Sequence, residues 1–167
     1  MSVVLRTLRG CVAIVVVLAA CGDSSVSRTE YADRVDAICA DFKDLAGSVV
    51  DPAVGSYFEA VDEFAFTDFG LQGYYAMLEA LDDSVLVQWR QEMFEDISDL
   101  KPPTEGADEF ADHIAARRKA FDDERVAISA AADDAELARA LWESTESPHL
   151  ALDHDAILLG IPSCRFG

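Results

Sequence analysis

The sequence predicts an all-α protein, a bundle of five or six helices. Over most of the 167-residue chain, apolar side chains recur at spacings of three and four residues, which places them on one face of a helix. Asp, Pro and Gly residues separate these segments. No segment alternates apolar and polar side chains as a half-buried strand does. The length suits a single domain with one core.

The first helix is expected from residue 28 to about residue 50, on the apolar period. Ser27 and Glu30 have the spacing of a capping box, in which a hydroxyl precedes a glutamate by three residues. We expect Asp51–Pro52 to end this helix and begin the next, because Pro is favourable in a first turn. The apolar face of this first helix is formed by Tyr31, Val35, Ile38, Phe42, Leu45 and Val49.

Seven of the chain's 15 aromatic residues lie between positions 57 and 75. One interpretation is a helix packed between two neighbours, with its rings in the core. The alternative is an aromatic-lined groove for a small apolar ligand or a partner helix, since ligand pockets are mostly apolar and aromatic. The groove residues would be Tyr57, Phe58, Phe64, Phe66, Phe69, Tyr74 and Tyr75.

Gly70 and Gly73 indicate a turn or a break after this segment. A further helix is expected over 74–100. Residues 82–84 are a potential interruption of it, because Asp and Ser favour caps over helix interiors. Lys101-Pro102-Pro103 ends it.

The remaining helices are placed by their caps. Thr104 is a suitable N-cap for a helix that continues to position 131. Asp133–Asp134 ends that helix and caps a short one that reaches Trp142. Ser147–Pro148 begins the last helix, and Gly160 stands where a left-handed C-terminal cap belongs.

Residues 1–20 have the organisation of a secretory leader. Arg6 and Arg9 precede a short apolar run, and Ala19–Ala20 follow it. The run is well short of the ~20 residues that a bilayer crossing needs. Leu18-Ala19-Ala20-Cys21 resembles the lipobox of bacterial lipoproteins. The resemblance implies cleavage before Cys21, diacylglyceryl attachment to its sulfur, and a protein anchored by lipid on the extracytoplasmic face of the cell membrane.

With Cys21 acylated, residues 21–27 form a short tether and 28–167 a single helical domain. Cys39 and Cys164 are then left as an even pair in an oxidising compartment. We expect a disulfide that joins the first helix to the C-terminal tail and closes the bundle. Two free buried thiols are the alternative, and no Cys or His spacing favours a metal site.

Three stretches stand out beside the lipobox: EYADRVDAIC at 30–39, LKPP at 100–103 and LGIPSC at 159–164. Together they resemble a set of small, uncharacterised secreted or lipid-anchored helical proteins from actinobacteria. The resemblance implies the helical fold and the bridge, and it implies no catalytic activity.

The composition argues against two classes of partner. A formal net charge of −19 opposes binding to nucleic acid, which depends on Lys and Arg contacts to phosphate. It also opposes adsorption to an anionic membrane, so the lipid would supply the membrane contact. The basic residues Arg117, Arg118 and Lys119 are expected to pair with neighbouring acids. A docking point for an acidic partner or a lipid headgroup is the alternative.

Enzymatic motifs are absent from the sequence, which contains no GxSxG, HExxH or phosphate-binding glycine loop. Glu109 and His113 have a spacing that metal sites use, but a solvated acidic surface is the favoured interpretation. We predict no metal and no cofactor. The expected function is a non-enzymatic binding or envelope-assembly role with an envelope protein as partner. The alternative is a carrier or sensor of a small apolar ligand that uses the aromatic segment 57–75.

Overall fold

The computed structural model describes residues 25–61, 65–144 and 149–166. Within these ranges the chain forms six α-helices and no strand, and an isolated parallel bridge joins Val26 to Pro103. The predicted all-α class is confirmed. The helices are α1 (Arg28–Val61), α2 (Asp68–Leu81), α3 (Val87–Ser98), α4 (Ala107–Asp133), α5 (Ala135–Glu143) and α6 (Leu150–Leu159).

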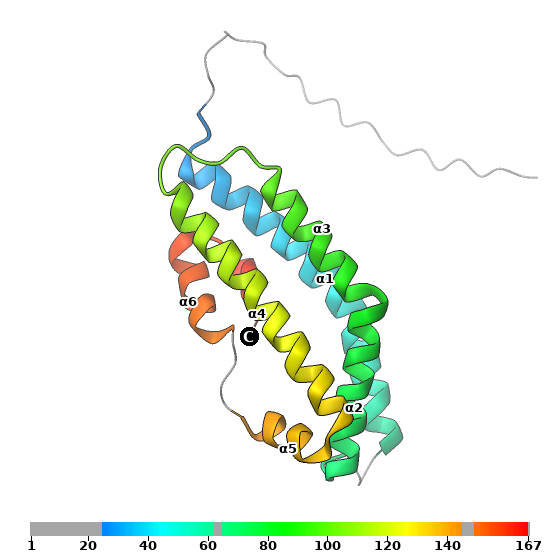
Figure 1. Cartoon of the computed structure of the whole chain (residues 1–167). Coiled ribbons are helices and arrows are strands. Elements are labelled where there is room, and N and C mark those ends of the chain that lie inside the picture. The colour runs from blue at the N-terminus through cyan, green and yellow to red at the C-terminus, as the bar shows by residue number, and fades with distance from the viewer. Residues whose placement is uncertain (1–24, 62–64, 145–148, 167) are drawn as a thin grey trace, which may run out of the picture.

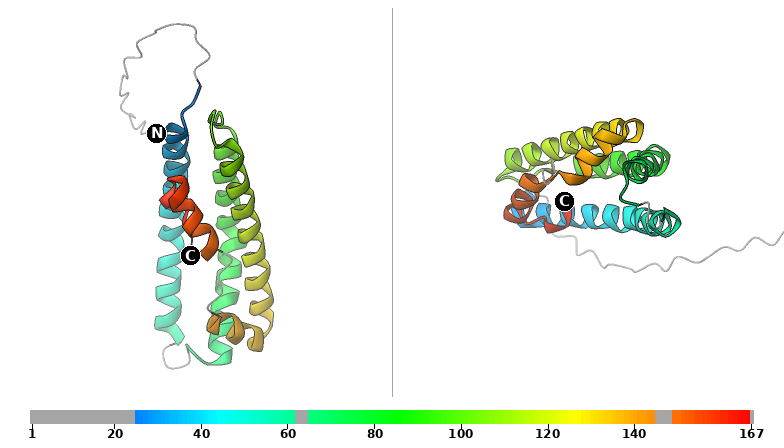
Figure 2. Two further views of the ribbon diagram at one scale, coloured as in Figure 1. Left: turned by 90° about the vertical axis from the view of Figure 1, so that its left-hand side faces the viewer. Right: turned by 90° about the horizontal axis from the view of Figure 1, so that it is seen from below.

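Three long rods make up most of the molecule (Figure 1). The first is α1, the second is α2 continued by α3, and the third is α4, and each runs opposite to the one before it. The short α5 lies at the end of the bundle where α1 ends and α2 begins, and it packs on α2 and α4. Helix α6 lies beside the other half of the bundle, next to α4 and α1 (Figure 2).

Helix α1 begins as predicted but continues past its predicted end. The backbone N–H of Glu30 donates to Ser27 Oγ at 3.1 Å, so Ser27 caps the first turn. The expected end at Asp51–Pro52 is wrong, because α1 runs through Pro52 to Val61. A proline inside a helix removes one hydrogen bond and crowds the preceding turn. Here the part of α1 beyond Pro52 packs on α2, which offsets that cost.

Gly70 and Gly73 do not break the chain, contrary to prediction. Both lie inside α2, whose N-cap is Thr67, and the Thr67 hydroxyl accepts from the Gly70 N–H. A Cβ added at Gly73 would lie 2.6 Å from the Tyr57 hydroxyl oxygen, and that hydroxyl donates to the Gly70 carbonyl. The absence of a side chain at Gly73 therefore allows α1 and α2 to approach closely.

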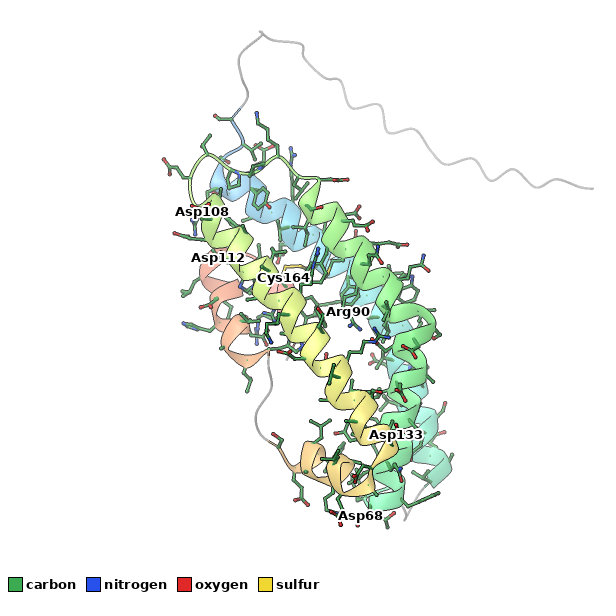
Figure 3. The ribbon with its side chains drawn as sticks, viewed as in Figure 1. Asp68, Arg90, Asp108, Asp112, Asp133 and Cys164 are labelled. Atoms are coloured by element: carbon green, nitrogen blue, oxygen red, sulfur yellow. A yellow bond between two sulfur atoms is a disulfide. The ribbon has the colours of Figure 1, made fainter. Side chains whose placement is uncertain are left out.

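The predicted interruption at 82–84 is a π-helical turn, Asp82–Leu86, which joins α2 to α3 in one continuous rod. Asp82 is buried there and pairs with Arg90 of α3 and with Arg125 of α4. Figure 3 shows Arg90 on the inner side of α3, where its guanidinium lies 4.7 Å from the centre of the Phe121 ring. The π turn thus brings Asp82 to two arginines.

The caps of the later helices follow the sequence in part. Helix α3 ends at Ser98, before the Lys101-Pro102-Pro103 stop. The N-cap of α4 is Gly106, in the left-handed conformation with φ 74°, so the prediction of Thr104 is wrong. The Thr104 N–H donates instead to the Val26 carbonyl, beside the Val26–Pro103 bridge.

The N-cap of α5 and the C-cap of α6 are those predicted from the sequence. The Asp134 side chain accepts from the Glu136 and Leu137 N–H groups at the start of α5. Gly160 ends α6 with φ 80°, as expected. Ser147 and Pro148, predicted to begin the last helix, lie outside the described residues, and α6 begins at Leu150.

The apolar side chains form two clusters. The larger joins the first half of α1 to α3, the first half of α4, α6 and the C-terminal 3₁₀ turn Pro162–Cys164. Its largest fully buried members include Phe110, Ile161 and Val35. The smaller cluster joins α2, the end of α4 and α5 around Leu71, Tyr75, Ala131 and Ala138.

The predicted disulfide is present. Cys39 of α1 and Cys164 of the 3₁₀ turn are bonded, with an S–S distance of 1.97 Å, and both residues are buried. Figure 3 shows Cys164 in the interior of the half that contains α6. The Asp36 carboxylate accepts from the Ser163 N–H and hydroxyl at 2.6 and 3.0 Å, which fixes the same turn on α1. The leader and Cys21 lie outside the described residues.

Across the ranges that the structure describes, no helix combines the length and the apolar character that a membrane crossing requires.

Candidate functional site

An apolar groove of about 660 Å³ lies where α5 packs against α2 and α4. Its volume is within the range of small-molecule sites. Two carboxylates, Asp123 and Glu124, and Ser144 add polar groups to its lining. Its main apolar walls are Tyr74, Tyr75 and Leu78 from α2, Ile128 from α4, and Leu141 and Trp142 from α5.

Aromatic rings support one side of the groove. Tyr74 and Trp142 meet nearly edge to face, with ring centres 5.9 Å apart. The ring of Phe58 lies 5.5 Å from Tyr74 and 6.4 Å from Trp142, and Phe66 lies 5.7 Å from Trp142. Such pairs add to the energy gained from burial alone. Segments far apart in the sequence are thereby joined into one aromatic wall.

The groove residues predicted from the sequence fall into three groups. Tyr74 and Tyr75 line the groove directly. Tyr57, Phe58 and Phe66 belong to the ring cluster that contacts Tyr74 or Trp142. Phe69 is 81% exposed and lies outside the lining, and Phe64 lies outside the described residues. The segment 57–75 thus contributes both to packing and to the groove, so the two interpretations are not exclusive.

The sequence does not predict the other half of the groove. It predicts a long helix that continues to position 131 and a short one that reaches Trp142, but it does not indicate that Ile128, Leu141 and Trp142 lie in one groove with Tyr74. Their contacts depend on α5 folding back after Asp134. One signal for this packing is present in the sequence of α5. Its apolar face, formed by Leu137, Leu141 and Trp142, indicates that the helix packs against another part of the protein.

A chain of polar contacts leads from the groove into the bundle. Glu124 Oε2 lies 3.3 Å from His149 Nε2, and His149 Nδ1 lies 3.1 Å from Arg117 Nη1. Arg117 Nη1 also pairs with Asp153 Oδ1 at 2.9 Å. The Asp153 carboxylate accepts from the Phe166 N–H at 3.0 Å. The groove is therefore connected to the disulfide-bonded tail through buried side chains.

The arrangement defines the tautomer of His149. A guanidinium only donates hydrogen bonds, so His149 Nδ1 accepts from Arg117. The ring proton of neutral His149 is then on Nε2, which donates to Glu124. Burial raises the pKa of Tyr74, and the negative charge of Glu124 raises it further. Glu124 thus presents its charge toward the tyrosine wall of the groove.

The two residues with a metal-site spacing, Glu109 and His113, have different surroundings. Glu109 pairs with Arg28 at 2.8 Å, whereas His113 is buried. No group of three His, Cys, Asp or Glu side chains in the described part of the chain has an arrangement that holds a metal ion.

The three basic residues of α4 separate. Arg117 is buried, Lys119 pairs with Asp123, and the Arg118 guanidinium lies 4.8 Å from the centre of the Phe94 ring. Arg117 and Lys119 thus pair with acids of the same chain, as expected, and the partner of Arg117 is the distant Asp153 of α6.

Comparisons with protein-family models, with curated proteins and with solved structures found no match.

Proposed function

We propose that the protein is an acylated, non-enzymatic binding module on the extracytoplasmic face of the cell membrane, and that it holds a small apolar ligand in the groove between α2, α4 and α5. The observation that carries the ligand is the groove itself, about 660 Å³ with Tyr74, Leu141 and Trp142 in its walls. The support for the anchor is the lipobox resemblance at Cys21.

The position of the groove fits a tethered protein. Glu124 lies 17 residues after Ala107, the first residue of α4. At 1.5 Å per residue, that is about 26 Å along the helix from the end of the bundle that carries the N-terminus. A bundle held by its N-terminus would therefore present the groove to the aqueous phase, where a water-borne ligand reaches it.

A photoaffinity experiment tests the ligand site. The acylated protein in phosphatidylcholine vesicles is irradiated with a neutral alkyl-diazirine alcohol, and the labelled peptides are identified by mass spectrometry. We expect labelling on α2 and α5 peptides that contain Tyr74 or Trp142. Ala127→Trp fills the groove, since Ala127 lines it, and should abolish this labelling.

The matched control is Ala130→Trp, which adds the same ring to an exposed position of α4 and should leave labelling unchanged. Absence of groove labelling in the native protein, or equal labelling of both variants, would contradict the ligand site. The anchor has its own test. The intact mass should include a diacylglyceryl group on Cys21, and Cys21→Ser should lose it.

A second candidate, docking of an envelope protein, is favoured by one observation. Helix α6 exposes Leu150, Ile157 and Leu158, the last at 68% exposure. Exposed apolar side chains that gather on one element mark interaction surfaces. A photo-crosslinking residue at position 158 should capture a defined envelope protein in cells, and the same residue at position 92, on exposed α3 surface, should not.

A further inference from the structure

The groove contains one carboxylate, that of Glu124, with no Lys or Arg partner among the described residues. Two carboxylates line it, and their situations differ. Asp123 pairs with Lys119 at 2.5 Å. Among the residues that the structure describes, no Lys or Arg pairs with Glu124, and the neighbouring Arg125 pairs with Asp82 and Asp83 instead.

His149 makes a single contact with Glu124. It reaches Glu124 through Nε2, but its Nδ1 faces Arg117 Nη1. Nδ1 accepts from Arg117, so Nε2 is the ring nitrogen through which His149 contacts Glu124. Arg117 itself pairs with Asp153, so its charge is already matched.

The aromatic part of the lining suits a cation as well. Tyr74 and Trp142 line the groove together with Glu124, and their rings are 5.9 Å apart. The faces of Trp and Tyr rings attract ammonium groups within about 6 Å. A carboxylate beside two such rings gives a positively charged group two favourable interactions, while the remaining walls, Leu78, Ile128 and Leu141, are apolar.

From this arrangement we propose that the ligand of the groove is a cationic amphiphile, an alkyl- or arylammonium compound whose apolar body lies among Leu78, Ile128 and Leu141 and whose ammonium group contacts Glu124 beside Tyr74 and Trp142. The proposal rests on the proposed function and adds the charge class of the ligand. An alkyl carboxylate of the same size is disfavoured, because two carboxylates line the groove and the whole chain carries a net charge of −19.

The expected preference is moderate because Glu124 is partly exposed. Its side chain is 42% accessible, so water and salt screen the interaction. We expect the ammonium compound to reach half-saturation at about a tenfold lower concentration than the matching alcohol, which corresponds to ~1.4 kcal/mol. The carboxylate should bind more weakly than the alcohol. Because the preference is electrostatic, it should shrink with added salt, and binding of the alcohol should change little.

The experiment uses three alkyl-diazirine probes of equal chain length that end in an ammonium, a hydroxyl or a carboxylate group. Each is titrated against the acylated protein in phosphatidylcholine vesicles, and labelling of the Tyr74 and Trp142 peptides is quantified. Glu124→Gln keeps the shape of the side chain and removes its charge. It should lower labelling by the ammonium probe about tenfold relative to labelling by the alcohol.

Asp133→Asn is the matched control, because it removes an exposed carboxylate of α4 that does not line the groove. It should behave as the native protein does. Two outcomes would overturn the charge class alone, provided that the alcohol labels the groove. One is equal half-saturation for all three probes. The other is an ammonium preference that survives in Glu124→Gln. Failure of every probe to label the groove would overturn the proposed function together with it.

Discussion

Arg117 and Asp153 form an ion pair inside the bundle, with Nη1 and Oδ1 2.9 Å apart and side chains only 1% and 9% exposed. The pair joins α4 to α6, and the Arg117 guanidinium lies 5.3 Å from the centre of the Phe166 ring. The Nε and Nη2 atoms of Arg117 have no hydrogen-bond partner among the described residues. Removal of the partner of a charge buried in this way strongly destabilises the folded state.

Asp153→Asn should therefore lower the free energy of unfolding by about 3–5 kcal/mol, because it leaves the Arg117 charge buried without its counter-ion. Urea unfolding of the single variant, compared with Arg117→Met/Asp153→Leu, provides the measurement. The double variant should recover most of the loss, since apolar replacements of a buried pair are often neutral or stabilising. A single variant within 1 kcal/mol of the native protein would show that water or backbone carbonyls already satisfy Arg117.

Removal of the Cys39–Cys164 bridge should also destabilise the fold. The two residues are 125 positions apart, so the bond closes a long loop in the unfolded chain. The chain-entropy model gives about 4–5 kcal/mol for such a loop. Cys39→Ala/Cys164→Ala should lose that amount in urea unfolding. Dithiothreitol should bring the native protein to the midpoint of the variant and should not affect the variant. A reductant effect that persists in the variant would contradict this account.

His113 should make stability depend on pH. Burial lowers the pKa of His113 from its usual 6.5, the charge of Arg117 lowers it further, and Asp155 and Asp153 oppose the shift. Between pH 6.5 and the lower pKa of the folded state, the unfolded chain binds more protons. The free energy of unfolding therefore falls as pH decreases through that window.

The measurement is the urea midpoint at pH 7.5 and pH 5.5. His113→Leu should show a smaller decrease between the two pH values than the native protein, because both His113 ring nitrogens are buried without a partner in the described structure and only the titration is lost. His154→Leu alters an exposed residue and should retain the native decrease. Equal decreases in all three proteins would rule out His113 as the cause.

The sequence predicts the helices well where signals are local. Ser27, Asp134 and Gly160 are caps that the adjacent residues define, and all three are found in their predicted roles. The disulfide is predicted from the count of cysteines, on the expectation that the chain is exported to an oxidising compartment. Pro52 and Gly73 mislead because their local preference is outweighed by packing of α1 on α2, including the close approach of Tyr57 to Gly73.

The candidate site depends on contacts that no local pattern encodes. Tyr74 was predicted for a groove because aromatics are dense around it, but Trp142 and Glu124 join it only through the packing of α5 and α4. Arg117 is the clearest example. The sequence predicts that Arg117 pairs with an acid, but its partner Asp153 is 36 residues away on α6 and is brought there by the docking of the C-terminal segment.

Two glycines in different conformations should respond oppositely to the same substitution. Gly160 ends α6 with φ 80°, which an L-residue adopts at a cost of roughly 1–2 kcal/mol. Gly55 lies inside α1, is exposed, and has nothing within 4 Å of the position where a Cβ would be added. Alanine there should stabilise the helix by roughly 0.5–1 kcal/mol, because glycine loses more backbone freedom on folding.

Gly160→Ala should accordingly lower the melting temperature and Gly55→Ala should raise it, as measured by circular dichroism at 222 nm under identical conditions. The nearest atom to a Cβ at Gly160 would be the Ala32 Cβ at 3.7 Å, an ordinary contact, so crowding adds little to the backbone cost. The comparison separates backbone conformation from packing. An unchanged melting temperature for Gly160→Ala would mean that the turn before Pro162 relaxes to a negative φ. The Cys39–Cys164 bond would then still hold the tail on α1.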